Sequence, residues 1–238
     1  MKKILSISAS TVLLSLSASA AITVVGGTPS YSSTGSGFDY TPSAIGNVLV
    51  AGTYSDNPAS SITFDGNTAV EDLTDGRSVL SYYVTTDTTE IAIAPVGGSA
   101  NGMFLYELSG VDTSASVVSS ITGTITTPVD NSFVVSLGSA NGNNPSVTPT
   151  GSIVVGINEQ VSGNGGGGLR GGTFTYDTAG SQDVGWTVTG GGTNTPQARL
   201  AFSFSPATES IIVPEPSSAA LFGLSGLALL LRRRKLAF

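Results

Sequence analysis

The segment Arg199-Leu-Ala-Phe-Ser-Phe-Ser205 places a large apolar side chain at every second residue. Successive side chains of a β-strand point to opposite faces of a sheet, so this period of two predicts a strand whose core face carries Leu200, Phe202 and Phe204. The same alternation recurs through the middle of the chain, where a helical period is nearly absent. The central region is therefore predicted to be all-β.

Turn residues separate these alternating segments. Asp-Gly, Asn-Gly and Gly-Gly pairs lie between them, and such pairs favour the tight turns of antiparallel hairpins. Many short strands of this kind predict a single antiparallel β-sandwich or jelly-roll-like domain. Strands are expected at 48–54, 61–64, 69–72, 79–85, 90–94, 102–109, 117–126, 132–137, 152–158, 173–176, 183–189 and 199–205.

Reading the faces of the other strands extends the predicted core. It contains Ile62, Phe64, Ile91, Ile93, Phe133, Val135, Leu137, Ile153, Val155 and Ile157. Five of the six residues 163–168 are glycine, which adopts many backbone conformations and offers no side chain for packing. We expect this stretch to form a mobile surface loop.

The N-terminus has the three parts of a secretory signal. Met1-Lys2-Lys3 is a short positive start, residues 4–16 form an apolar stretch diluted with serine, and Ala18-Ser19-Ala20 is a small-residue pattern that signal peptidase accepts. Residues 1–20 are therefore predicted to be a signal peptide, with cleavage between Ala20 and Ala21. Residues 21–212 would then be the exported domain.

The charge of this central region differs from that of the whole chain. The whole chain has a net charge of −7, but six of its nine basic residues lie in the two end segments. The central region has three basic residues, Arg77, Arg170 and Arg199, and 15 acidic ones, which gives it a net charge of −12. Such a surface repels nucleic acid and anionic lipid, so no nucleic-acid partner is expected.

Two residue types are missing altogether. The chain has no cysteine and no histidine. This excludes disulfides, a thiolate nucleophile, a Ser-His-Asp triad and histidine metal ligands within this chain. We therefore expect no catalytic residue, no metal site and no cofactor.

Three signals follow one another at the C-terminus. Pro214, Glu215 and Pro216 form a motif that holds the backbone extended, because proline fixes its own φ and restricts the preceding residue. Residues 218–231 carry no charge and favour a short membrane helix. The basic cluster after it would stay cytoplasmic and leave the central domain outside. This cluster consists of Arg232, Arg233, Arg234 and Lys235.

Residues 213–235 closely resemble the PEP-CTERM sorting signal, in which the same three elements occur in the same order. The resemblance implies that an exosortase-like membrane enzyme of Gram-negative bacteria processes the chain near Pro-Glu-Pro. It also implies an exported protein that is held transiently in the inner membrane by its C-terminal helix. After processing the protein would lie at the cell surface or outside the cell.

A second resemblance covers residues 61–111. The segments Ser61-Ile-Thr-Phe-Asp-Gly-Asn-Thr-Ala-Val70, Leu80-Ser-Tyr-Tyr-Val84 and Leu108-Ser-Gly-Val-Asp-Thr113 are similar to a β-sandwich module of bacterial extracellular proteins. The likeness implies an adhesive or scaffolding fold and carries over no catalytic residue.

Several acidic residues are candidates for a catalytic or calcium-binding site. A glycosidase needs two carboxyl groups about 5 to 10 Å apart, and the candidates are Glu71, Asp72, Glu107 and Glu159. Glu71, Asp72 and Asp75 could instead supply oxygen ligands to calcium. Their spacing fits neither kind of site, so all are expected to be solvated surface charges, with Glu107 on an outer face.

Aromatic and threonine side chains offer two further possibilities. Trp186 shares a face with Val184 and Val188 and is predicted to lie in the core, which leaves Tyr83 and Tyr176 as candidate exposed rings for stacking on sugars. Flat threonine arrays can bind ice, but no fixed-period repeat aligns the threonines here. They alternate at Thr122, Thr124 and Thr126, at Thr173 and Thr175, and at Thr187 and Thr189.

The sequence thus predicts a non-enzymatic surface protein with a structural or adhesive role. Its expected partners are signal peptidase, an exosortase-like enzyme and extracellular polysaccharide. The alternatives are a carbohydrate-binding module, a carboxylate-based polysaccharide-degrading enzyme and, behind these, an ice-binding protein.

Overall fold

A computed structural model describes residues 18–209, apart from 27–29, 33–36, 56, 58, 76, 99–100, 141–145, 151–152, 162–166 and 190–196. The regular elements within these ranges are antiparallel β-strands, which confirms the predicted all-β class and supports the resemblance to a β-sandwich module. Residues 19–207 form one compact unit. Strand β1 (Ala18–Ser19) pairs with β21 (Thr208–Glu209).

The N-terminal half of the compact unit forms two sheets. The first has the order β2 (Thr23–Val24), β11 (Gly102–Ser109), β5 (Val48–Tyr54), β9 (Ser78–Val84) and β8 (Glu71–Asp75), and β3 (Ser30–Ser32) also pairs with β11. The second has the order β4 (Phe38–Tyr40), β10 (Ile91–Val96), β6 (Ser61–Phe64) and β7 (Asn67–Thr68).

The C-terminal half forms one large sheet and two small ones. The large sheet has the order β12 (Val118–Ser120), β20 (Gln197–Phe204), β14 (Ser132–Ala140), β17 (Gly167–Tyr176) and β16 (Val154–Val161). The small sheets pair β13 (Thr124–Thr127) with β18 (Gly180–Asp183) and β15 (Ser146–Pro149) with β19 (Trp186–Thr189).

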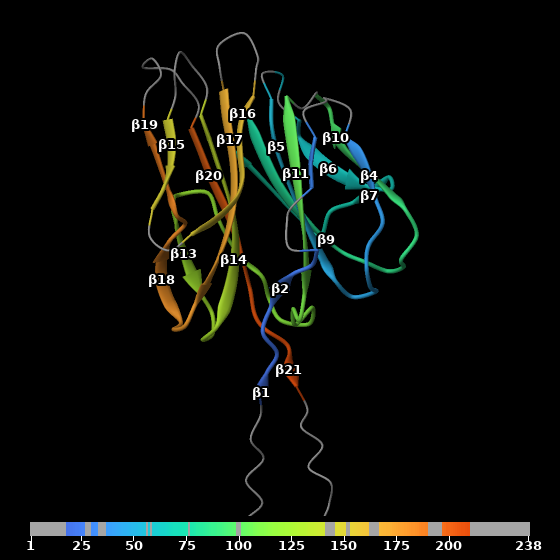
Figure 1. Cartoon of the computed structure of the whole chain (residues 1–238), viewed down its shortest axis with the longest axis vertical. Helices are drawn as coiled ribbons and strands as arrows, with labels where there is room; N and C mark the ends of the chain where they lie inside the picture. The colour runs from blue at the N-terminus through green and yellow to red at the C-terminus, as the bar shows by residue number, and fades with distance from the viewer. Residues whose placement is uncertain are drawn as a thin grey trace, which may run out of the picture. The chain divides into compact units, whose positions relative to one another are not determined.

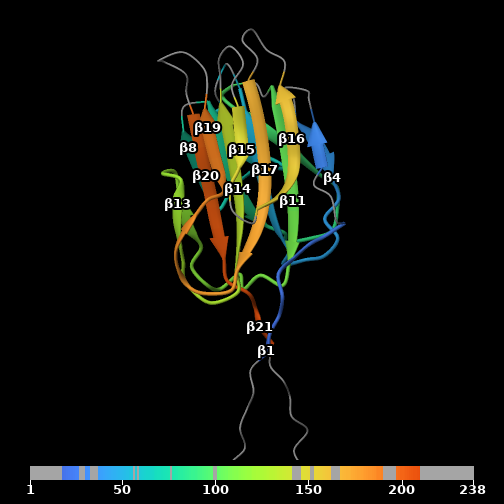
Figure 2. The same ribbon diagram turned by 60° about the vertical axis from the view of Figure 1, so that its left-hand side comes forward.

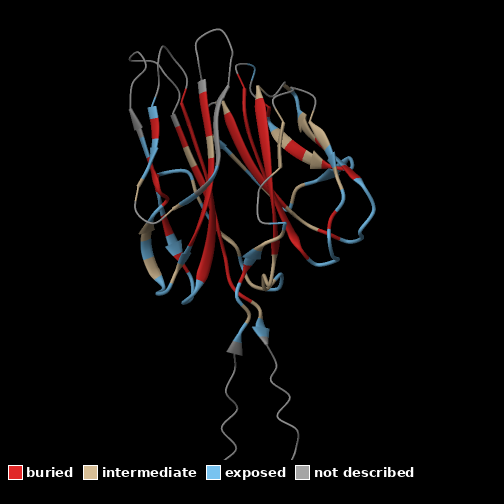
Figure 3. Cartoon of the chain, viewed as in Figure 1, coloured by how far each residue is buried: buried red, intermediate tan, exposed pale blue. Residues whose placement is uncertain are grey.

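The described strands stack as four layers (Figures 1 and 2). The two large sheets lie inside, with the β4–β10–β6–β7 sheet outside one of them and the β13–β18 and β15–β19 pairs outside the other. Strands β5 and β14 are consequently buried along their whole length (Figure 3). A sandwich whose two sheets are covered on their outer faces needs apolar residues on both faces of each central strand.

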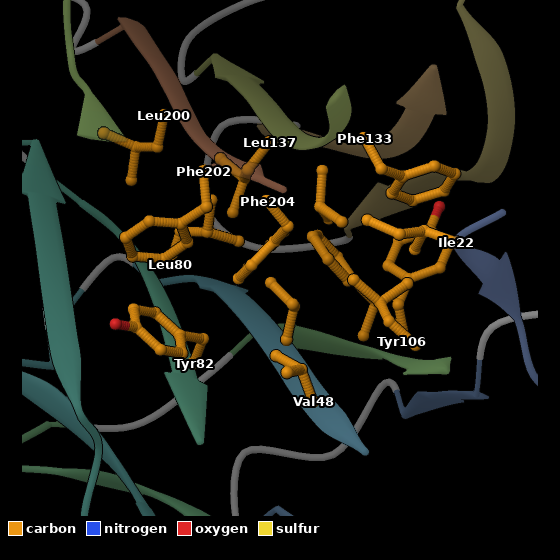
Figure 4. Close-up of a cluster of buried hydrophobic side chains, with 14 of the residues drawn as sticks. Ile22, Val48, Leu80, Tyr82, Tyr106, Phe133, Leu137, Leu200, Phe202 and Phe204 are labelled. Atoms are coloured by element: carbon orange, nitrogen blue, oxygen red, sulfur yellow. The ribbon is translucent and has the colours of Figure 1, made fainter. Parts of the chain in front are cut away.

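The largest apolar cluster lies between the two inner sheets (Figure 4). In it, Tyr82 of β9 meets Phe202 and Phe204 of β20 edge to face. Phe104 and Tyr106 of β11 and Leu200 of β20 belong to the same cluster. A second cluster, with Ile62, Phe64 and Ile93, fills the space under the β4–β10–β6–β7 sheet. Smaller clusters around Phe174 and Trp186 lie under the outer strand pairs of the C-terminal half.

The two halves share one strand order. In the inner sheets β11, β5, β9 and β8 follow each other as β20, β14, β17 and β16 do. The registers agree, because Leu49 pairs with Tyr83 and Val134 pairs with Phe174, and all four residues belong to or pack on the outer clusters. The chain is therefore an internal repeat of a two-layer unit, with the large sheets of both copies face to face.

One outer strand differs between the halves. In the N-terminal half β10 runs unbroken and pairs with both β4 and β6. In the C-terminal half β18 pairs with β13 and β19 pairs with β15, and Val184 and Gly185 separate these two strands. Gly185 has a φ of +88°, a conformation that favours glycine and redirects the chain between the two pairs.

Most of the predicted core is confirmed. Leu200, Phe202 and Phe204 are buried, as are Ile62, Phe64, Ile91, Ile93, Phe133, Val135 and Leu137, while Ile153 is half-buried. The side chains of Val155 and Ile157 lie outside the described residues. Ala201 and Ser203 point away from the main core as expected, yet they are buried too, because the outer strand pairs cover that face.

Three sequence expectations need correction. The predicted strands 117–126 and 183–189 each divide into two, the first where Gly123 (φ +89°) turns the chain from β12 in the inner sheet to β13 in the outer pair. The predicted loop 163–168 is also wrong at its end, because β17 begins at Gly167; residues 163–166 lie outside the described residues. Glycine in β17 lets other side chains pack directly against the backbone. A Cβ added at Gly172 would lie only 2.5 Å from Ile153 Cδ1.

Close packing at Trp186 leads to a stability prediction. A Cβ added at Gly138 would lie 2.7 Å from Trp186 Cγ and 2.9 Å from Val147 Cγ1. Gly138→Ala should therefore lower the free energy of unfolding by about 1–3 kcal/mol. Trp186 is the only tryptophan and is buried, so urea unfolding followed by its fluorescence measures the change.

The matched control is Gly168→Ala in the neighbouring strand. A Cβ there would make ordinary contact, 3.7 Å from Val147 Cγ2, and we expect a change within about 0.5 kcal/mol. Equal losses in both variants would show that contact with the indole ring is not what requires glycine at 138.

Candidate functional site

The acidic residues of β8 do not converge. Asp72 accepts hydrogen bonds from Ser81 Oγ and, at 3.4 Å, from Ile62 N, whereas Glu71 and Asp75 point to the other face of the strand. Within the described residues no group of three or more acidic side chains could hold a metal ion. The side chain of Glu159 lies outside the described residues.

Glu107 corrects a sequence prediction. It was expected on a solvated outer face, but it is only 2% exposed, because β4 and the segment before β5 cover that face of β11. Four hydrogen bonds satisfy both carboxylate oxygens. Tyr40 Oη donates to Oε2 at 2.6 Å, and Oε1 accepts from Ser43 N at 2.8 Å, Ser43 Oγ at 2.8 Å and Asn47 Nδ2 at 2.6 Å.

The hydrogen bonds keep this buried carboxylate charged. Burial by itself raises the pKa of Glu107, but the bonds from Asn47, Tyr40 and Ser43 outweigh burial and leave the pKa below its usual value. Burial and the adjacent carboxylate raise the pKa of Tyr40 well above its usual value. Glu107 therefore fastens an outer strand to an inner sheet, and neither of its oxygens is free to act on a substrate.

A cleft of about 410 Å³ opens in the C-terminal half, between the end of β17, the start of the outer strand pair at β18, and Thr150 and Ile153. Its lining includes Phe174 of the outer cluster and Gly185 of the break between β18 and β19. Its walls mix two aromatic rings with hydroxyl, amide and carboxylate groups. They consist of Thr150, Ile153, Phe174, Thr175, Tyr176, Asp177, Thr178, Gln182, Asp183 and Gly185.

Asp183 joins the two sides of this cleft. Its Oδ1 accepts hydrogen bonds from Gly185 N at 2.6 Å and from Thr150 Oγ1 at 3.2 Å. Thr150 N in turn donates to Gly185 O at 2.7 Å. The segment after β15 is thus tied to the turn after β18, and the walls are fixed before any ligand arrives.

Tyr176 is held in the same wall. Its hydroxyl donates to the backbone oxygen of Asp183, and its ring meets that of Phe174 edge to face with 4.7 Å between centroids. Burial and the nearby charge of Asp183 raise the pKa of Tyr176 to about 12. Tyr176, which the sequence suggested as an exposed ring, is half-buried and lines the cleft.

The equivalent place in the N-terminal half holds only a small hollow. It has a volume of about 30 Å³, and its lining includes Tyr83, Thr85, Thr86 and Asp87. By strand register Tyr83 stands where Phe174 stands in the other half. Thr85, Thr86 and Asp87 follow it in the sequence as Tyr176, Asp177 and Thr178 follow Phe174. Tyr83, the second candidate ring, stacks on Phe64 at 5.1 Å between centroids.

The remaining candidates are structural. Trp186 is buried as predicted, and its Nε1 donates to Ser136 Oγ at 2.8 Å. The threonines lie on strands of three different sheets, β13, β17 and β19, with Thr122 between β12 and β13. They do not form one flat array.

Sequence reasoning singled out Tyr176 but missed Asp177, Gln182 and Asp183. The run from Tyr176 to Asp183 ends one strand and forms the next, so its polar residues read as an ordinary turn and outer strand. Only the passage of the chain from β17 in the inner sheet to β18 in the outer strand pair brings them to one cleft. The nearest available signal in the sequence was Tyr176 at the end of a predicted strand, followed directly by Asp177.

A comparison with protein families identifies the C-terminal tail. Residues 213–235 match the PEP-CTERM protein-sorting motif, which confirms the resemblance seen in the sequence. The motif indicates a secreted, surface protein processed by exosortase, a membrane enzyme. Comparisons with curated proteins and with solved structures give no match to the chain.

The sorting residues themselves lie outside the described residues. They are Pro214, Glu215, Pro216, Arg232, Arg233, Arg234 and Lys235, and residues 218–231 lie there too. Within the part of the chain that is described, no helix is long and apolar enough to cross a membrane.

The Glu107 cluster leads to a pH prediction. Because the pKa of Glu107 is lowered in the folded state, its stabilising effect is present above the unfolded value of about 4.3 and is lost as pH falls through the folded value. Glu107→Gln should lower the free energy of unfolding by about 1.5–3 kcal/mol at pH 7. The deficit should shrink at pH 3, as measured by urea unfolding at both pH values.

Glu90→Gln serves as control, because Glu90 is exposed. We expect it to change stability by less than about 0.5 kcal/mol at either pH. A Glu107→Gln deficit that is the same at pH 3 and pH 7 would contradict a charged carboxylate as the source of the stabilisation.

Proposed function

We propose that the protein is a non-enzymatic structural or adhesive component of the cell surface or extracellular matrix. The observation that carries the proposal is the sorting motif at residues 213–235, because such a tail directs an exported protein to exosortase. In the proposed route signal peptidase cuts between Ala20 and Ala21. The C-terminal helix then holds the chain in the inner membrane until processing near Pro-Glu-Pro.

The physical properties of the tail support this route. An uncharged run of 14 residues is shorter than the ~20 of an ordinary spanning helix, and flanking arginines can extend such a segment to the interface. The four basic residues after it favour a cytoplasmic end. The central domain would then wait on the outer side of the membrane, joined to it by the extended Pro-Glu-Pro segment.

The arrangement of the acidic residues favours binding over catalysis. A glycosidase needs one carboxyl group as acid and another as nucleophile or base, both facing the substrate. Glu107 is buried with four hydrogen bonds, and Asp183 Oδ1 holds two walls together. These acids support the structure around them, which suits a scaffold.

A polysaccharide-degrading enzyme is the second candidate. Asp177 and Asp183 line the same cleft of about 410 Å³, so two carboxyl groups lie beside one space. Release of reducing ends from a soluble polysaccharide by the purified protein, abolished by Asp177→Asn, would establish the enzyme and end the non-enzymatic proposal.

The sorting route is tested by changing the motif in the producing cells. In Pro214→Ala/Pro216→Ala the backbone is no longer held extended, so we expect the processing enzyme to cut poorly. The variant should accumulate in the membrane fraction several-fold over the unchanged protein, as measured by immunoblots of membrane and medium.

Ser218→Ala, just beyond the expected cleavage region, is the neighbouring control and should be released normally. Release of the proline variant at the normal rate would show that the motif does not direct processing.

A further inference from the structure

We propose that the cleft between β17 and β18 is a binding subsite for a neutral saccharide unit of an extracellular polysaccharide. The proposal deepens the adhesive function and rests on it, because only an exported protein meets such polymers. Three observations support it: the volume of the cleft, the residues that line it, and the much smaller hollow at the equivalent place in the N-terminal half.

The internal repeat shows how the cleft arises. Both halves have a depression at the end of the equivalent strands β9 and β17, yet their volumes are about 30 and 410 Å³. In the N-terminal half β10 is unbroken, and Tyr83, which lines the small hollow, stacks on Phe64. In the C-terminal half the break at Val184 and Gly185 leaves the cleft open.

The volume suits one or a few sugar units. Sites for small ligands measure about 300–1,000 Å³ and combine apolar walls with a few fixed polar groups. Here the apolar part is Phe174, Tyr176 and Ile153. Hydrogen bonds from Thr150 and Gly185 hold the Asp183 carboxylate in place in advance. A preformed wall reduces the entropy lost on binding.

The lining selects for a ligand rich in hydroxyl groups. The carboxylates of Asp177 and Asp183 can only accept hydrogen bonds, and the Gln182 amide and the threonine hydroxyls can both donate and accept. A sugar offers many hydroxyl donors, and the apolar C–H face of its ring packs against an aromatic side chain. Tyr176 supplies such a ring, held rigidly by its hydrogen bond and by Phe174.

Charge narrows the class further. None of the described lining residues is cationic, and the central region has a net charge of −12. Phosphorylated sugars and uronates would therefore meet repulsion at the cleft. A neutral hexose or pentose unit satisfies the acceptors without that cost.

The experiment titrates the protein, purified as the producing cells make it, with five hexasaccharides in a calorimeter. Cellohexaose, laminarihexaose, xylohexaose and mannohexaose are the neutral probes, and hexagalacturonate is the anionic one. We expect at least one neutral probe to bind and hexagalacturonate not to bind. Absence of binding by all four neutral probes, or preferred binding of hexagalacturonate, would overturn the proposal.

A pair of matched variants places the binding in the cleft. Asp177→Ala/Gln182→Ala removes one acid and one amide from its lining and should weaken binding about tenfold or more. Asp87→Ala/Asn67→Ala removes the same two group types from the small hollow of the N-terminal half and should leave binding unchanged. Equal weakening by both variants would contradict a site in the cleft.

Two further readouts separate failure of this proposal from failure of the proposed function. Trp186 fluorescence shows that each variant is folded, and Asp177→Asn, which keeps the size of the side chain, replaces the double variant if that one is unfolded. A chain that is released from cells but binds no saccharide would overturn the proposed binding site in the cleft and leave the sorting route standing. Binding accompanied by reducing ends would keep the saccharide site but overturn the non-enzymatic role.

Discussion

The contact between the two inner sheets is the constraint on which the rest of the structure depends. Each half of the chain is a thin two-layer unit, and the cluster around Phe104, Tyr106, Leu137, Phe202 and Phe204 joins the halves. Burying one such side chain contributes about 1.5–3 kcal/mol. With no cysteine in the chain, this apolar contact takes the place of the disulfides that staple many secreted domains.

Comparing the two halves also shows which features both copies share and which belong to one copy alone. By strand register Glu107 of β11 corresponds to Ser203 of β20, and both are buried beneath an outer layer. The N-terminal half fastens that layer with a carboxylate and four donors, and its outer sheet is continuous. The C-terminal half has a serine at this position and a divided outer layer, and there the cleft opens. The two halves therefore differ in their outer layers, while their inner sheets have the same strand order.

Sequence reasoning succeeded where the signal is local. Strands 48–54, 61–64 and 102–109 were predicted to the residue, and the sorting tail was read from adjacent motifs. It failed where pairing partners decide the outcome. No residue close to Glu107 in the sequence indicates that β4 covers it. The glycines of β17 resemble a loop in the sequence, and only the structure shows that Trp186 and Ile153 pack against them. The cleft depends on the passage of the chain from β17 in the inner sheet to β18, which pairs with β13 in the outer layer, and no single window of sequence shows that pairing.

Intact-mass analysis of the protein recovered from the producing cells and from their medium tests the central claim most directly. The account predicts a chain that begins at Ala21 and ends between Pro214 and Ser217, found outside the cell. A chain that keeps residues 232–238 and stays in the membrane would contradict it, because the tail would then be a permanent anchor.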